Sequence, residues 1–177
     1  EEVLAAQREA SPRFRGIRHW LNWDAHTGAM GLRSDAPPRH AADPILREGY
    51  KVLGKLGLLF DAWLYFPQLP DLIELARAHP DVPIALNHVG GLLGLGPYAN
   101  RGEAFKLWRG HMLTLATCPN VCVKLGGMGV PRCGFAWHER ETPPSSEQLA
   151  SAFAPSSPAN CRRTSSESRR MVRLRPA

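Results

Sequence analysis

Short, mostly apolar segments alternate along this chain with segments whose apolar residues recur at helical spacing, and no other feature constrains the fold as strongly. We expect strands over residues 13–19, 58–65, 84–89 and 121–125, and helices over 1–10, 44–56, 71–79, 102–117 and from Ser145 onward. Such strand–helix alternation indicates an α/β fold with a parallel sheet. The segment 58–65 is apolar enough that we expect this strand to be buried on both faces.

Capping residues support these helix boundaries. Asp43 is a good N-cap, and Pro44 stands at the first helical position. Gly57 is placed to end the same helix. Ser145 and Gln148 have the spacing of a capping box.

Two α/β architectures are compatible with this alternation: part of a (β/α) barrel and a doubly wound open sheet. A complete eight-stranded (β/α) barrel needs about 250 residues, whereas this chain has 177. We therefore expect a partial TIM barrel, an incomplete piece of a longer fold. A doubly wound open sheet would fit the same alternation, and periodicity alone does not separate the two.

The pattern changes after residue 155, which predicts a division into a barrel domain (1–155) and an Arg/Ser-rich tail (156–177). The tail holds six arginines and one glutamate, a formal charge of +5, so the body carries only +1 of the total +6. The composition predicts a disordered segment, foreign to the fold or out of frame. Because the basic charge lies in the tail, we expect no nucleic-acid partner for the body. Association of the tail with nucleic acid or a membrane surface stays as an alternative.

The remaining composition indicates a cytoplasmic protein without a membrane partner. No apolar run approaches the ~18 residues that span a bilayer, and the N-terminus does not resemble a signal peptide. The four cysteines form no CxxC pair and no zinc-finger spacing, so we expect reduced thiols. They are Cys118, Cys122, Cys133 and Cys161.

Candidate functional residues are those at the C-terminal ends of the strands, where parallel α/β folds place their sites. They are His19, Tyr65, Gln68, Asn87, His88 and Lys124, with Cys133, His138 and Glu139 in the loop after the last strand. A single strand-end histidine is more often structural than catalytic, and Tyr65 could simply pack. Lys124 is unusual because a lysine in an apolar strand needs a partner. We expect the other histidines, including His40, to face solvent.

Four motifs, in this order, resemble the amidohydrolase-2 family of TIM-barrel hydrolases, which includes sugar and dicarboxylate lactonases. They are RGIRHW (15–20), LLFDAWLYFPQL (58–69), NHVGG (87–91) and NVCVKLGG (120–127). The resemblance covers about residues 1–155.

The resemblance implies roles for particular residues. It implies that His88 is catalytic or a metal ligand, although Asn87 stands where the family has Asp. It implies a catalytic His19, with Arg18 facing the substrate. Tyr65 and Lys124 match strand-end positions that contact the substrate, and we add Gln68 and His138 to the substrate-binding set. The implied substrate is a small molecule with a lactone, ester or amide carbonyl, attacked by activated water.

Two parts of the family pattern are missing from this sequence. Nothing in residues 1–13 resembles the His-x-His strand that supplies two metal ligands, and the sequence after Pro155 lacks the family's late strand with the acid that activates water. A divalent ion, Zn or Mn, would act in an intact member, but a catalytic zinc takes about three protein ligands. We therefore expect this chain alone to be inactive. The alternative is a non-catalytic module that binds a small acid through Arg18, Tyr65 and His88. Under both hypotheses the chain could form a homo-oligomer.

Overall fold

The computed structural model describes residues 1–154 and the backbone of residues 162–163 and 171–173. Four parallel strands form the centre of the fold: β1 (Gly16–Trp20), β2 (Leu59–Trp63), β3 (Ile84–Leu86) and β4 (Val121–Lys124). The helices are α1 (Glu2–Ala10), α2 (Pro44–Lys55), α3 (Leu69–Ala78), α4 (His88–Gly91), α5 (Arg101–Leu115) and α6 (Ser146–Phe153). Short 3-10 helices lie between them: η1 (His40–Ala42), η2 (Phe66–Gln68), η3 (Gly96–Tyr98), η4 (Pro131–Cys133) and η5 (Trp137–Glu139).

The predicted strand–helix alternation is confirmed, with boundaries that differ by a few residues. The expected caps are present: the Asp43 side chain accepts a hydrogen bond from the Ile45 amide, and Ser145 and Gln148 form a capping box. The third strand is shorter than expected. It ends at Leu86 because the chain turns through left-handed backbone at His88 and Val89, which removes His88 from the strand.

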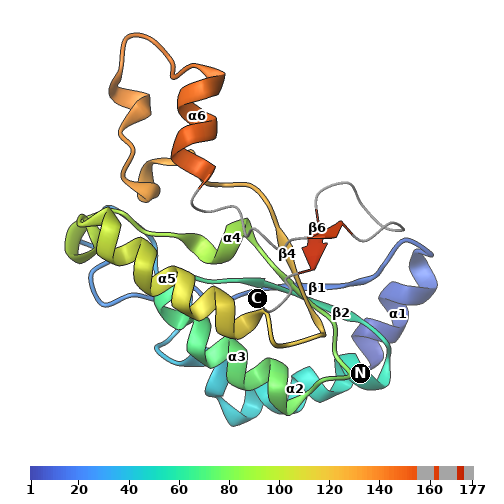
Figure 1. Cartoon of the computed structure of the whole chain (residues 1–177). Coiled ribbons are helices and arrows are strands. Elements are labelled where there is room, and N and C mark those ends of the chain that lie inside the picture. The colour runs from blue at the N-terminus through green and yellow to red at the C-terminus, as the bar shows by residue number, and fades with distance from the viewer. Residues whose placement is uncertain (155–161, 164–170, 174–177) are drawn as a thin grey trace.

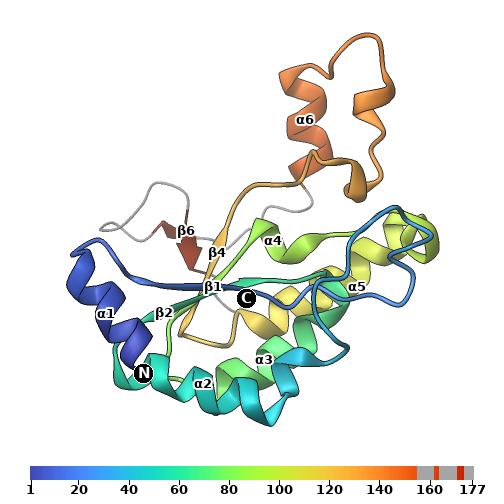
Figure 2. The same cartoon turned by 180° about the vertical axis from the view of Figure 1, so that it is seen from behind.

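Strand order decides between the two architectures. The four parallel strands lie side by side in chain order, β1-β2-β3-β4. Helices α2, α3 and α5 lie on one side of the sheet, and the two opposite views agree on this placement (Figures 1 and 2). A doubly wound sheet reverses its strand order and carries helices on both faces. The chain therefore folds as part of a TIM barrel.

The helix-covered face of the sheet forms the core. Phe60, Ala62, Ile84 and Leu86 on this face are at most 2% exposed, and they pack with residues of the three helices such as Leu72. Side chains alternate between the faces of a strand, and the burial of β2 alternates with them. The expectation that residues 58–65 are buried on both faces was therefore wrong: Leu59, Asp61 and Trp63 lie half-buried on the uncovered face. This is the face that lines the lumen in a closed barrel, and we call it the lumen face.

Two short strands of the tail extend the sheet. β6 (Met171–Arg173) pairs antiparallel with β4, and β5 (Arg162–Arg163) pairs antiparallel with β6. The rest of residues 155–177 lies outside the described residues, so the predictions of disorder and foreign origin are not tested there. None of the helices in the described part of the chain is long and apolar enough to cross a membrane.

Candidate active site on the lumen face

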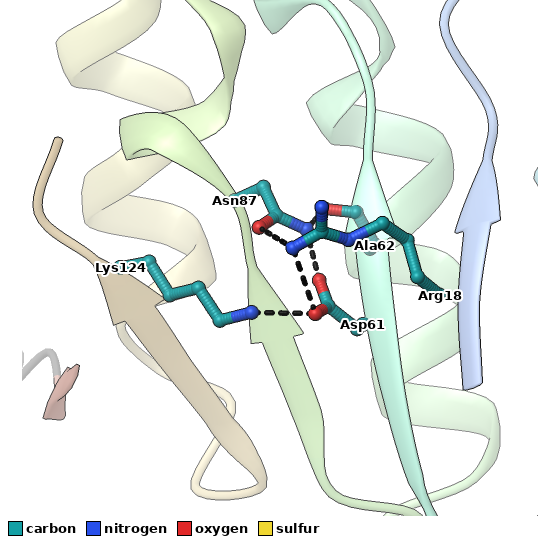
Figure 3. A network of polar contacts seen from close by, with 5 residues as sticks. All are labelled: Arg18, Asp61, Ala62, Asn87 and Lys124. Carbon is teal, nitrogen blue, oxygen red and sulfur yellow. Dashed lines mark hydrogen bonds and ion pairs between the residues drawn. The ribbon is translucent and has the colours of Figure 1, made fainter. Parts of the chain in front are cut away.

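The lumen face carries a cluster of polar side chains from β1, β2 and β4 and from the residue that follows β3. The parallel register pairs Arg18 with Asp61 and Asp61 with Ala85, and alternation places Asn87 and Lys124 on the same face. Figure 3 shows Arg18, Asp61, Asn87 and Lys124 pointing toward one another. We call these four residues the Asp61 cluster.

Asp61 is the hub of this cluster. Its Oδ2 accepts hydrogen bonds from Lys124 Nζ at 2.5 Å and Arg18 Nη2 at 3.2 Å. Its Oδ1 accepts a hydrogen bond from Asn87 Nδ2. Burial by itself would raise the pKa of Asp61, but these hydrogen bonds outweigh that effect and lower the pKa overall. Asp61 is therefore held as a carboxylate that already accepts three hydrogen bonds, which makes it a poor proton acceptor.

Asn87 fixes the geometry of the cluster. Its Nδ2 donates to the Ala62 carbonyl at 3.0 Å, and its Oδ1 accepts from Arg18 Nη2 at 3.1 Å. The side chain is 1% exposed. Asn87 thus orients Arg18 and Asp61.

His88 lies next to the Asp61 cluster. Its ring approaches Trp63 edge-on, with the centroids 5.3 Å apart. Burial, together with the nearby charges of Arg132, Arg18 and Lys124, lowers the pKa of His88. At neutral pH the imidazole is therefore uncharged, the form that can accept a proton or bind a metal.

Glycine at position 127 allows the loop after β4 to pass close to His88. A Cβ on Gly127 would lie 2.7 Å from His88 Nδ1, and the residue has φ of +67°. Only glycine meets both conditions without strain.

The other predicted site residues are placed elsewhere. His19 lies on the helix-covered side of the sheet, where its Nε2 is 3.0 Å from His40 Nε2 and its ring contacts Phe60. It does not join the Asp61 cluster, so its predicted catalytic role finds no support from the residues of that cluster. His40 is half-buried against it, so the expectation that His40 faces solvent was wrong.

Tyr65 and Gln68 are tied into the loop structure beside the site. The Tyr65 hydroxyl donates to the Arg33 carbonyl at 2.7 Å. Gln68 accepts from the amides of Trp23 and Tyr65 and donates to the Leu21 carbonyl, and it is 8% exposed. These bonds connect the loops after β1 and β2, which leaves Gln68 little capacity to bind a substrate.

His138 lies in η5, exposed to solvent, with its Nε2 3.6 Å from Glu139 Oε1. Both views show α6 and its preceding loops standing out from the sheet on the side opposite α2, α3 and α5 (Figures 1 and 2). The substrate-binding role expected of His138 stays a prediction.

Sequence reasoning missed two residues of this region, Asp61 and Arg132. Asp61 could have been found, because a carboxylate inside an apolar strand needs partners as much as Lys124 does. Arg132 lies eight residues beyond the end of β4 and is brought back by η4, which no strand-end rule predicts.

The donor set near His88 does not fit a divalent metal. Residues 1–154 contain no group of three or more His, Cys, Asp or Glu side chains that could hold one. The charges around His88 are mainly the cations Arg132, Arg18 and Lys124, and Asp61 is already paired. The metal-ligand role of His88 stays a prediction.

The chain is similar in sequence to a known family and to two curated proteins. Residues 1–156 match the family described as amidohydrolase. The uncharacterized protein y4mH of Sinorhizobium fredii is 38% identical over 79% of this chain and 43% of its own length. L-fucono-1,5-lactonase of Burkholderia ambifaria is 33% identical over 66% of this chain and 34% of its own length. The chain thus spans less than half the length of these curated relatives.

Solved structures support the fold. Two crystal structures of an amidohydrolase from Burkholderia multivorans are similar, one with bound HEPES and one with bound zinc. The TM-scores are 0.59 and 0.60 at 24% and 23% identity. Each alignment covers 85% of this chain and 48% or 47% of the other.

Proposed function

Since the chain belongs to the amidohydrolase family, we propose that its lumen face is the substrate-binding part of a hydrolase that acts on a lactone, ester or amide carbonyl. The Asp61 cluster is the observation that carries this proposal, because it gathers two cationic donors at the strand ends where barrel enzymes place their chemistry. The similarity to an L-fucono-1,5-lactonase favours a lactone.

Hydrolysis develops negative charge on the carbonyl oxygen, and donors fixed in advance stabilise it. Lys124 and Arg18 are such donors: Lys124 is 30% exposed and Arg18 is 53% exposed, so both can reach a ligand. Asp61 and Asn87 hold them in place. In the same proposal the uncharged His88 hydrogen-bonds the attacking water or the carbonyl oxygen.

Among the described residues, no group is suited to activate the attacking water. Asp61 is a poor base because its pKa is lowered and it already accepts three hydrogen bonds. His88 alone would supply only one of the ~3 protein ligands that a catalytic zinc takes. We therefore propose that this chain alone binds its substrate without turnover, which is also the behaviour of the small-acid-binding alternative.

The three thiols of the described part are free, which agrees with a cytoplasmic location in this proposal.

The test is a titration of the chain with L-fucono-1,5-lactone and with its product L-fuconate, followed by calorimetry and by acid release. We expect saturable binding of either compound and no acid release above background. Lys124→Met should weaken binding about tenfold through loss of a charge-assisted hydrogen bond. Lys106→Met, at an exposed position of α5, should not.

The outcomes separate the parts of the proposal. Equal binding by Lys124→Met and the parent chain would refute the site. Turnover that Lys124→Met abolishes would support the site and refute the inactivity of the chain.

A further inference from the structure

His88 lies on the face of the sheet opposite to the one that strand alternation predicts for it. Side chains alternate between the two faces of a strand, and Leu86 packs in the helix-covered core whereas Asn87 joins the Asp61 cluster on the lumen face. A strand that continued would therefore place residue 88 under the helices. His88 instead contacts the ring of Trp63 on the lumen face, so the backbone changes its course at this residue.

A left-handed turn over residues 88–91 makes this change. Its four residues have φ of +48°, +49°, +76° and +60°, and the Gly90 amide donates to the Asn87 carbonyl at 2.9 Å. Glycine adopts such a backbone freely, which suits Gly90 and Gly91. His88 and Val89 do not, and positive φ at a β-branched residue is rare and strained. Strain of this kind persists only where the surrounding contacts fix the conformation.

Trp108 of α5 supplies such a contact. Its indole Nε1 donates a hydrogen bond of 2.7 Å to the carbonyl oxygen of Val89. Both residues are buried, with Trp108 3% and Val89 2% exposed. Loss of this bond would leave a buried N–H and a buried carbonyl without partners, and both are costly. The bond therefore favours the left-handed turn over a backbone that directs the Val89 carbonyl elsewhere.

We propose that Trp108 is a positioning residue of the candidate active site, because its hydrogen bond to Val89 holds the turn that carries His88 to the lumen face. The inference rests on the proposed function for the part that His88 plays in the reaction. It extends the site through the sheet, since α5 covers the side opposite to the Asp61 cluster (Figures 1 and 2).

The test is Trp108→Phe in the full chain, which removes the indole N–H and keeps an aromatic ring in the core. The readout is the nuclear Overhauser effect between the ring protons of His88 and Trp63, whose ring centroids are 5.3 Å apart. The His88 signals are assigned by their absence in His88→Gln. We expect this effect in the parent chain and its loss in Trp108→Phe, because a relaxed turn withdraws His88 from Trp63.

One control and one further measurement accompany this variant. Leu115→Ala truncates a fully buried side chain on the same helix, so it also destabilises the chain, but it should keep the effect between His88 and Trp63. In the parent chain, the indole proton of Trp108 should exchange with solvent at least about tenfold more slowly than that of Trp20. Trp20 is 47% exposed. This comparison decides the case if Trp108→Phe does not fold.

An unchanged effect in Trp108→Phe would overturn the inference. Equal loss of the effect in Leu115→Ala would do so too, as would exchange of the Trp108 indole proton as fast as that of Trp20. None of these readouts requires a ligand. If L-fuconate fails to bind the parent chain while Trp108→Phe alone loses the effect, the proposed function is refuted and the positioning role of Trp108 stands.

Discussion

At the scale of single residues, Asp61 holds the other polar side chains of the lumen face in position. It is 15% exposed and bonded to Arg18, Lys124 and Asn87. Without it, the cations Arg18 and Lys124 would face one another with no carboxylate between them. We therefore assign Asp61 a positioning role and not a proton-transfer role.

We predict that Asp61→Asn lowers the free energy of unfolding by about 1–2 kcal/mol, because it removes the charge that pairs with Lys124 and Arg18. Urea denaturation measures the change. Glu48→Gln is the matched control, since Glu48 pairs with Lys51 at 2.6 Å on an exposed helix surface. It should leave the stability nearly unchanged.

We also predict that the stability difference between the parent chain and Asp61→Asn depends on pH. Because the folded-state pKa of Asp61 is lowered, its stabilisation is fully present above the unfolded-state value of about 3.9. It is lost as the pH falls through the lower folded-state pKa. The stability difference between the parent and Asp61→Asn should therefore shrink on acidification, and a difference that grows would contradict the ion pairing.

At the scale of elements, loops hold the ends of the strands in place. Gln68 connects the loops after β1 and β2 through three hydrogen bonds to the backbone. We predict that Gln68→Ala costs about 2 kcal/mol of stability, since it leaves buried backbone groups unpaired. Gln148→Ala removes the matching glutamine of the exposed capping box at α6. Thermal denaturation should show a smaller loss there, and equal losses would argue against the structural role of Gln68.

The loop after β4 gives a second prediction at this scale. Gly127→Ala should destabilise the chain and displace His88, because the new methyl group would meet the imidazole. Gly31→Ala is the control: Gly31 has φ of +63°, and a Cβ there would meet nothing within 4 Å. Imidazole NMR signals of His88 should move in the first variant only. If both variants lose the same stability and leave His88 unchanged, the close contact does not constrain the loop.

The sequence predicted elements better than side-chain placement. Hydrophobic periodicity and caps such as Asp43 and Ser145 identified the alternation, because both are local. The face on which a side chain lies depends on strand register: Arg18 and His19 are adjacent, yet one points into the lumen and the other under the helices. Gln68 looked available for a ligand because two of its three partners come from the loop after β1, which is distant in sequence.

At the scale of the whole molecule, the described sheet is one side of a barrel. Its lumen face and the outer edge of β1 are uncovered among the described residues, and Trp20 at the end of that strand is 47% exposed. Exposed strand edges promote association. We therefore predict that the chain forms a homo-oligomer, which light scattering coupled to size-exclusion chromatography measures. A monomer at all concentrations would refute this.

The central claim is that ligand binds on the lumen face and not between the helices. Amide NMR of the labelled chain titrated with L-fuconate tests this claim most directly. We predict that the shifted signals belong to the ends of β1–β4 and to residues 126–133. Shifts confined to the pocket between α1 and α2, lined by Leu4, His19, His40 and Leu46 among others, would contradict the account and restore His19 as the site residue.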